Sequence, residues 1–168
     1  MKEIYNETNC FDDLFSNICI NYPIPIKTVV LNKDAKIPTK GSEKAAGHDL
    51  YAAIEEPIEI RPHETEKIST GLSMALPPHT FGAIFARSGL ATKKGLRPAN
   101  DVGVIDEDYR GPIIVALHND SNDIQRIEPG ERIAQLIVLP YVSITFEKVD
   151  KLSSTERGET GFGNSGRF

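Results

Sequence analysis

Residues 103–111 read GVIDEDYRG, and the fold prediction starts from this stretch. Apolar residues lead into it, and three carboxylates and a tyrosine follow within four positions. Residues 112–118 continue as a second apolar run, PIIVALH. Two apolar runs joined by a polar turn with a glycine at each end are typical of successive antiparallel strands. The turn therefore carries Asp106 at the end of a strand, where it either faces a cleft or belongs to a solvated hairpin tip.

Short segments of alternating or continuous apolar character recur through most of the chain, with turn residues between them. Thirteen glycines and eleven prolines are spread along the 168 residues, as a fold with many turns needs. The pattern predicts roughly ten short strands and at most one or two short helices, arranged as an all-β sandwich or barrel. The expected strands cover residues 26–31, 58–61, 66–70, 72–76, 81–86, 112–118, 124–127, 132–139 and 142–149.

The length and charge of the chain limit its possible functions. A chain of 168 residues is expected to form one domain with a sizeable core. Its net charge of −5 argues against a nucleic-acid polymer as the main partner, although a small anionic ligand needs only local positive charge. No apolar run has the length of a membrane span, and the N-terminus lacks an apolar signal core. The chain is therefore expected to be cytoplasmic, with Cys10 and Cys19 as free thiols.

Residues 1–25 differ in pattern from the rest of the chain. Apolar residues recur at helical spacing between Phe11 and Cys19, and Pro23 and Pro25 end any helix there. The segment is interpreted as an N-terminal extension that consists of a short amphipathic helix and a linker. It either docks on the core or frays, or it binds a partner, and its sequence favours no particular partner.

Two segments upstream of the acidic turn carry candidate binding residues. In residues 45–53, AAGHDLYAA, small residues before Asp49 permit close backbone approach, although a buried Asp often only bonds a neighbouring turn. In residues 86–95, ARSGLATKKG, a strand runs into a predicted helical turn closed by Gly95. Arg87, Ser88 and the backbone N–H groups at this point suit an anion such as phosphate. The alternative is a structural turn with solvated lysines.

Two downstream segments carry further candidates. Gln135 is embedded in the apolar run 132–139, and its amide either braces a loop or contacts a ligand. The last twelve residues, RGETGFGNSGRF, contain the spacing Gly-x-Gly-x-x-Gly at 161–166, but only two residues follow it, so no dinucleotide-binding helix can open there. This end is either a disordered tail or a segment that closes over a ligand, with Phe162 on a flat ring and Ser165 and Arg167 on phosphate.

Five stretches of the chain resemble, in order, the five motifs of the trimeric dUTP diphosphatase (dUTPase) family. They are AAGHDLYAA (45–53), ARSGLATKKG (86–95), GVIDEDYRG (103–111), PGERIAQLIVLP (129–140) and RGETGFGNSGR (157–167). Each motif alone is of modest specificity, but five in the right order are very specific. The resemblance implies a distorted β jelly-roll of the β-clip type over residues 26–156. It also implies a homotrimer with active sites shared between subunits, each closed by a C-terminal arm, residues 157–168.

The resemblance also implies the reaction and the catalytic groups. dUTP would be hydrolysed to dUMP and pyrophosphate with Mg²⁺, which keeps uracil out of DNA and supplies dUMP for dTMP synthesis. Asp106 matches the general base that activates the attacking water. Tyr109 matches the residue that packs against the deoxyribose and leaves no room for a 2′-hydroxyl. Asp49 would meet the metal through water, because Mg²⁺ keeps much of its hydration shell and takes its other ligands from the triphosphate.

The remaining binding roles follow from the same match of positions. The backbone near residues 100–105 would read the uracil edge, residues of other motifs would hold phosphates, and the arm would cover the base. The residues are Asn100, Val104 and Ile105 for uracil, Arg87, Ser88, Gly89 and Gln135 for phosphates or the catalytic water, and Arg157, Phe162, Gly163, Ser165 and Arg167 in the arm.

The chain departs from the family pattern at two positions and leaves two other functions open. Ala86 stands where many members have proline, and Thr160 replaces a glycine that is common in the arm. One alternative is a dCTP deaminase of the same fold, which would need a catalytic glutamate after the central turn; residues 112–119 contain none. The other is a regulatory binding protein on a dUTPase scaffold, with residues 1–25 as its partner surface.

Overall fold

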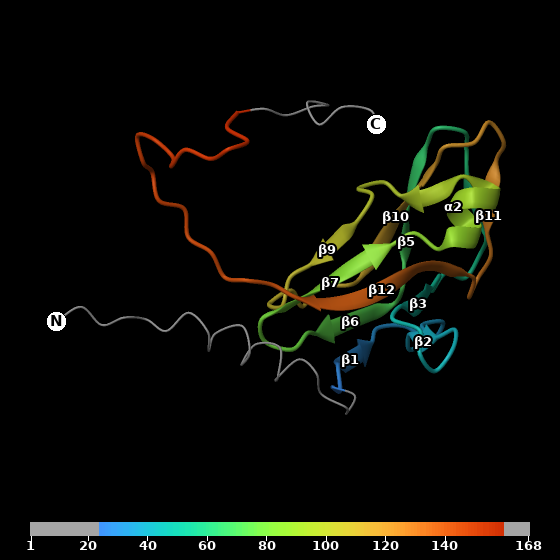
Figure 1. Cartoon of the computed structure of the whole chain (residues 1–168). Coiled ribbons are helices and arrows are strands. Elements are labelled where there is room, and N and C mark those ends of the chain that lie inside the picture. The colour runs from blue at the N-terminus through green and yellow to red at the C-terminus, as the bar shows by residue number, and fades with distance from the viewer. Residues whose placement is uncertain (1–23, 160–168) are drawn as a thin grey trace.

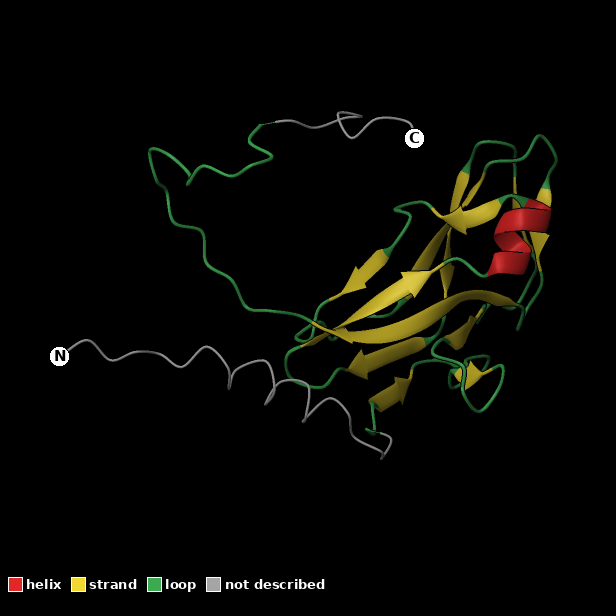
Figure 2. Ribbon diagram, in the orientation of Figure 1, coloured by secondary structure: helices red, strands yellow, loops and turns green. Residues whose placement is uncertain are grey.

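The computed structural model describes residues 24–159, and this part of the chain is built almost entirely of strands (Figures 1 and 2). It contains twelve strands and one short helix, and every pair of neighbouring strands is antiparallel. The prediction of an all-β fold is confirmed. The strands are β1 Lys27–Val30, β2 Thr39–Lys40, β3 His48–Tyr51, β4 Ile58–Ile60, β5 Thr65–Ser69, β6 Leu72–Ala75, β7 Thr80–Phe85, β8 Leu96–Pro98, β9 Gly103–Ile105, β10 Ile114–Asn119, β11 Gln125–Ile127 and β12 Arg132–Pro140, and the helix is α2 Ser88–Lys94.

The nine-residue strand β12 organises the largest sheet, whose strand order is β2-β3-β12-β7-β9. Its continuous apolar sequence suits a strand that is paired along both edges. The register places Gln135 opposite Asp49 on β3 and opposite Phe85 at the end of β7. Three segments that are far apart in sequence therefore meet at one end of this sheet.

Smaller sheets complete the fold around one core. Their strand orders are β5-β10-β8, β1-β6 and β11-β4. Within the described residues, no buried side-chain nitrogen or oxygen lacks a hydrogen-bond partner. The buried apolar cluster consists of Leu50, Ala52, Ile60, Ile68, Leu72, Met74, Ile84, Leu90, Leu96, Ile113, Val115, Leu117, Ile127, Ile133, Ala134 and Leu136.

The acidic turn joins two different sheets and is not a hairpin. β9 pairs with β7, whereas β10 pairs with β5 and β8. The expectation that the two flanking strands pair with each other is therefore wrong. Pro112 has no N–H to donate, and Ile113 exchanges backbone hydrogen bonds with Thr70 and Leu72 instead. These competing partners draw the chain after the turn away from β9.

The short helix α2 forms where the sequence predicts a helical turn. It begins directly after Arg87 and ends at Gly95, which is left-handed with φ 67°. Glycine adopts this conformation without the steric cost that a Cβ brings. Leu90 anchors the helix in the core, and Lys93 and Lys94 lie in its last turn, where positive charge is favourable.

The segment after β12 leaves the sheet without forming a strand (Figure 1). The prediction of a strand over residues 142–149 is wrong for the single chain, since no strand is described between residues 141 and 159. A strand needs a neighbour to satisfy its backbone, and no described segment pairs with this one. Its apolar side chains stay exposed, Val142 by 68%, Ile144 by 67% and Phe146 by 95%.

The other predicted strands lie within one or two residues of observed ones, whereas β2, β3 and β8, each of two to four residues, were not predicted as strands. Within residues 24–159 no helix has the length and apolar character that a membrane crossing requires. The predicted N-terminal helix and most of the arm lie outside the described residues, so the predicted division at residues 25/26 and 156/157 is not tested. They stay predictions.

Candidate active site

Five predicted site residues line one pocket at the end of β9. The pocket has a volume of about 300 Å³, at the lower end for a small-molecule site. Its walls are mostly apolar and come from β7, the end of β8, β9, β10 and the two turns beside β9. The predicted residues that line it are Asn100, Val104, Ile105, Asp106 and Tyr109.

Backbone and side-chain hydrogen bonds fix the shape of the acidic turn. The N–H of Tyr109 donates to the carbonyl of Asp106 at 3.1 Å, which closes the turn. The Tyr109 hydroxyl donates to the carbonyl of Pro112 at 3.1 Å, so the ring folds back along the chain. A Cβ at Gly111 would overlap this ring, so a larger residue there would force the ring out of this position. The folded ring forms one wall of the pocket.

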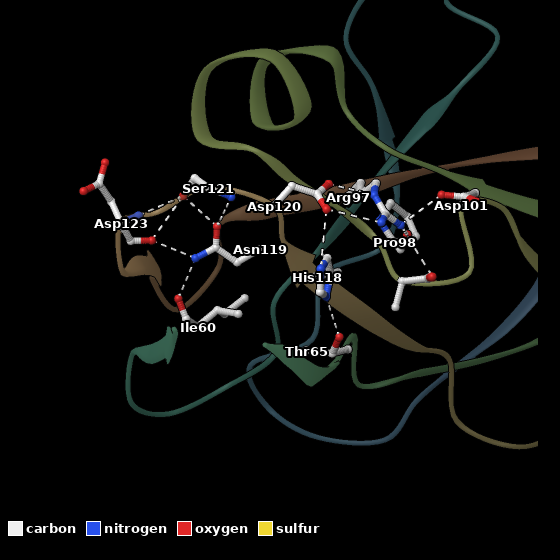
Figure 3. A network of polar contacts seen from close by, with 11 residues as sticks. Ile60, Thr65, Arg97, Pro98, Asp101, His118, Asn119, Asp120, Ser121 and Asp123 are labelled. Atoms are coloured by element: carbon white, nitrogen blue, oxygen red, sulfur yellow. Dashed lines mark hydrogen bonds and ion pairs between the residues drawn. The ribbon is translucent and has the colours of Figure 1, made fainter. Parts of the chain in front are cut away.

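Arg97 braces the loop that carries Asn100 (Figure 3). Its guanidinium donates to both oxygens of Asp120, at 2.7 and 3.3 Å, and to Asp101 at 2.9 Å. It also donates to the carbonyl of Pro98 at 3.2 Å. Asp101 has φ 59°, an uncommon conformation for a residue other than glycine. This network holds the loop on both sides of Asn100, and the sequence alone gave no signal of it.

A second group of predicted residues lies near the start of α2. Arg87 donates from Nε to Oδ1 of Asp49 at 2.9 Å, and Arg132 donates from Nη1 to Oδ2 at 3.1 Å. Only 13% of the Asp49 side chain is exposed. Two guanidinium groups against one carboxylate leave a positive surplus, which suits an anionic ligand. Arg132 was not among the predicted site residues, although it lies three residues before Gln135.

Gln135 braces the loop of Arg87. Its Nε2 donates to the carbonyl of Ala86 at 2.9 Å, and a Cβ at Gly47 would lie only 2.5 Å from its Oε1. The predicted close approach at Gly47 is therefore confirmed, because a Cβ there would force this amide to shift. Of the two alternatives for Gln135, bracing a loop is the one that the hydrogen bond supports.

The residues at this end of the sheet could bind Mg²⁺ only if the substrate supplied most of its ligands. Within residues 24–159 no three His, Cys, Asp or Glu side chains lie together in a way that could hold a metal. Each carboxylate oxygen of Asp49 already accepts one hydrogen bond. The remaining lone pairs can accept hydrogen bonds from water molecules bound to a metal ion. This donor set fits Mg²⁺, which retains waters and binds phosphate oxygens.

The two groups of residues lie at opposite ends of β7. Ile105 pairs with Gly82, so Asp106 lies level with Phe81, six residues before Arg87. At about 3.3 Å per residue, the two half-sites of one chain are roughly 20 Å apart. Arg157 is described but lies in the exposed C-terminal segment, whereas Phe162, Gly163, Ser165 and Arg167 fall outside the described residues.

Comparison with known proteins identifies the relatives of the chain. A family model described as dUTPase matches residues 33–166. The deoxyuridine 5′-triphosphate nucleotidohydrolase of Psychromonas ingrahamii is 45% identical over 138 residues, which is 82% of this chain and 91% of that protein. The enzyme of the same name from Desulfitobacterium hafniense is 44% identical over 146 residues, or 85% and 97% of the two chains.

Solved structures share the fold. A variant of the Staphylococcus bacteriophage 80alpha dUTPase with dUpNHpp matches with a TM-score of 0.77 and 28% identity, over 84% of this chain and 98% of that one. A dUTPase variant of S. aureus phage phi11, described with a structural Mg(II) ion, matches with a TM-score of 0.68 and 21% identity, over 76% and 98%. The predicted jelly-roll of the β-clip type is confirmed by these neighbours.

Proposed function

The chain belongs to the dUTPase family, and from this premise we propose how its two half-sites hydrolyse dUTP to dUMP and pyrophosphate. The chain is an enzyme, a dUTP diphosphatase. The observation that carries the proposal is the pocket beside β9, where Asn100, Asp106 and Tyr109 line one apolar hollow. A planar base and a sugar suit such walls, and Asp106 lies at the rim where an α-phosphate would follow.

The complete site is formed between copies of the chain in a homotrimer. The half-sites of one chain are roughly 20 Å apart along β7, too far for one nucleotide to use both. A neighbouring copy that brings its Arg87 end against this pocket removes the gap. The exposed apolar residues of the C-terminal segment, including Val142, Ile144 and Phe146, also favour an assembly that covers them.

Asp106 acts as the general base. Its carboxylate accepts a proton from a water molecule, and the oxygen of that water bonds to the α-phosphorus. The bond between the α-phosphorus and the oxygen that bridges it to the β-phosphate breaks, so pyrophosphate leaves opposite the attacking oxygen and dUMP remains. Positioning and charge neutralisation provide most of the acceleration in such displacements.

The phosphate half-site supplies positive charge and hydrogen-bond donors. Arg87, with Ser88 and Gly89 at the start of α2, binds phosphate oxygens, while Gln135 keeps the loop in place. Asp49 orients Arg87, and its carboxylate would hold a bound Mg²⁺ through water. Bound Mg²⁺ would neutralise the charge of the triphosphate oxygens.

The C-terminal arm closes the site once the nucleotide is bound. Phe162 stacks on uracil, and Arg157, Gly163, Ser165 and Arg167 contact the phosphates. Such closure excludes water other than the attacking one and completes the set of catalytic groups.

Tyr109 is the sugar gate of the pocket, and its replacement tests this role. Tyr109→Ala removes the ring, which the hydrogen bond from its hydroxyl to the carbonyl of Pro112 holds in place. The change opens space beside the sugar. The ratio of UTP to dUTP turnover is expected to rise about tenfold or more, since a rejected hydroxyl regains room. Steady-state kcat/KM for both nucleotides measures this ratio. An unchanged ratio would refute the gate.

Pyrophosphate release from a set of nucleotides tests the function as a whole. Purified protein with Mg²⁺ is expected to release pyrophosphate rapidly from dUTP and far more slowly from UTP, dCTP and dTTP. Ammonia release from dCTP would instead support the deaminase. Tight dUTP binding without turnover would support a regulatory binding protein.

A further inference from the structure

Glu107, next to Asp106, connects three segments of the chain. Its Oε2 accepts hydrogen bonds from the backbone N–H of His79 at 2.5 Å and from the hydroxyl of Tyr141 at 3.1 Å. The backbone N–H of Tyr141 in turn donates to the carbonyl of His79 at 3.1 Å. Glu107, His79 and Tyr141 thus form a closed triangle of hydrogen bonds. From the sequence alone, Glu107 is only the neighbour of Asp106 in the acidic turn.

The three corners of this triangle have different roles in the fold. His79 lies in the turn between β6 and β7 and has φ 61°, which is uncommon outside glycine. Tyr141 is the first residue after β12, where the C-terminal segment departs from the sheet (Figure 1). Glu107 therefore ties the turn that carries Asp106 to the exit point of the segment that leads to the arm.

Tyr141 lies beside the acidic turn, and the carboxylates of the turn affect the pKa of its hydroxyl. The hydrogen bond to Glu107, partial burial and the charges of Glu107, Asp108 and Asp106, in that order, raise the pKa of Tyr141 above its ordinary value. Its hydroxyl thus remains a donor throughout the neutral range. Tyr141 and the three carboxylates also line one open hollow of about 630 Å³ together with Phe81 and Val104.

We propose that Glu107 is a positioning residue for Asp106, acting through its hydrogen bonds to Tyr141 and His79. The inference rests on the proposed function of Asp106 as the base. A turn of four residues with an exposed carboxylate needs an anchor outside itself to hold that carboxylate on a bound water. The ring of Tyr109, which forms a wall of the pocket, has a separate hydrogen bond to Pro112. Loss of the Glu107 hydrogen bonds is therefore expected to displace Asp106 more than it displaces this ring.

Variants of both partners test the inference. Glu107→Ala and Tyr141→Phe are each expected to lower kcat for dUTP about tenfold, which is about 1.4 kcal/mol in the barrier, with KM within about threefold of wild type. Glu107→Gln keeps an acceptor oxygen and is expected to retain kcat within about threefold. Tyr51→Phe is the matched control, because it removes another tyrosine hydroxyl bond, to Thr39, away from the acidic turn.

The double variant separates positioning from general weakening of the fold. Because both changes break the same hydrogen bond, Glu107→Ala with Tyr141→Phe is expected to lower kcat no further than Glu107→Ala alone. Unchanged kcat in both single variants, even with a lower Tm, would overturn the inference, as would additive losses. Wild-type protein that does not hydrolyse dUTP would refute the proposed function itself, and the two failures are therefore distinguishable.

Discussion

Asp106→Asn is expected to lower kcat for dUTP by about 100- to 10,000-fold, the usual contribution of a general base. Asparagine has the same shape but does not accept a proton from the attacking water. The Asp106 side chain makes no described hydrogen bond that the change would remove, so Tm and the affinity for a non-hydrolysable dUTP analogue are expected to stay near wild type. Single-turnover kinetics measure the loss of turnover, a binding titration measures the affinity for the analogue, and thermal unfolding gives Tm.

Asp108→Asn is the matched control for that experiment. Asp108 lies two residues further along the same exposed turn, and its replacement removes the same charge from the open hollow that both residues line. Turnover is expected to stay within about threefold of wild type, because an exposed neighbouring charge is strongly screened. Equal losses in both variants would mean that local charge, and not proton transfer at Asp106, sustains catalysis.

Deletion of residues 157–168 is expected to lower kcat/KM for dUTP by about 100-fold or more, since closure orders the substrate and excludes water. The core strands end at Pro140, so the thermal unfolding of the truncated protein is expected to match that of the full chain. Phe162→Ala isolates the stacking contribution and is expected to raise KM. A truncated protein with full activity would show that the arm takes no part in the reaction.

The sequence predicted those features of the fold that depend on local pattern. Apolar runs located the strands on both sides of the acidic turn, and Gly95 marked the end of α2, because a left-handed residue after a helix favours glycine. Gly47 indicated close packing, which the amide of Gln135 provides. The two glycine predictions rest on steric requirements, and the strand predictions rest on the local distribution of apolar residues.

Features that depend on the choice of a partner were not predictable in this way. The alternation over residues 142–149 has no strand partner within the described chain, and β9 prefers β7 to β10. Arg132 and Arg97 bond carboxylates from distant segments, and their neighbours in sequence give no sign of these contacts. The sequence favours Asp106 over its neighbour Glu107 as the catalytic residue. The positioning role that we propose for Glu107 depends on its hydrogen bond to Tyr141, which only the structure shows.

Complementation between two inactive variants tests the central claim that neighbouring copies build each active site. Asp106→Asn and Arg87→Gln chains with different tags would be co-expressed and purified through both tags, so that every trimer contains both variants. If each site takes Asp106 from one copy and Arg87 from the next, one site in each mixed trimer is intact, and about one third of wild-type pyrophosphate release is expected. Mixed trimers as inactive as either variant alone would show that each chain builds its own site, and would contradict the account.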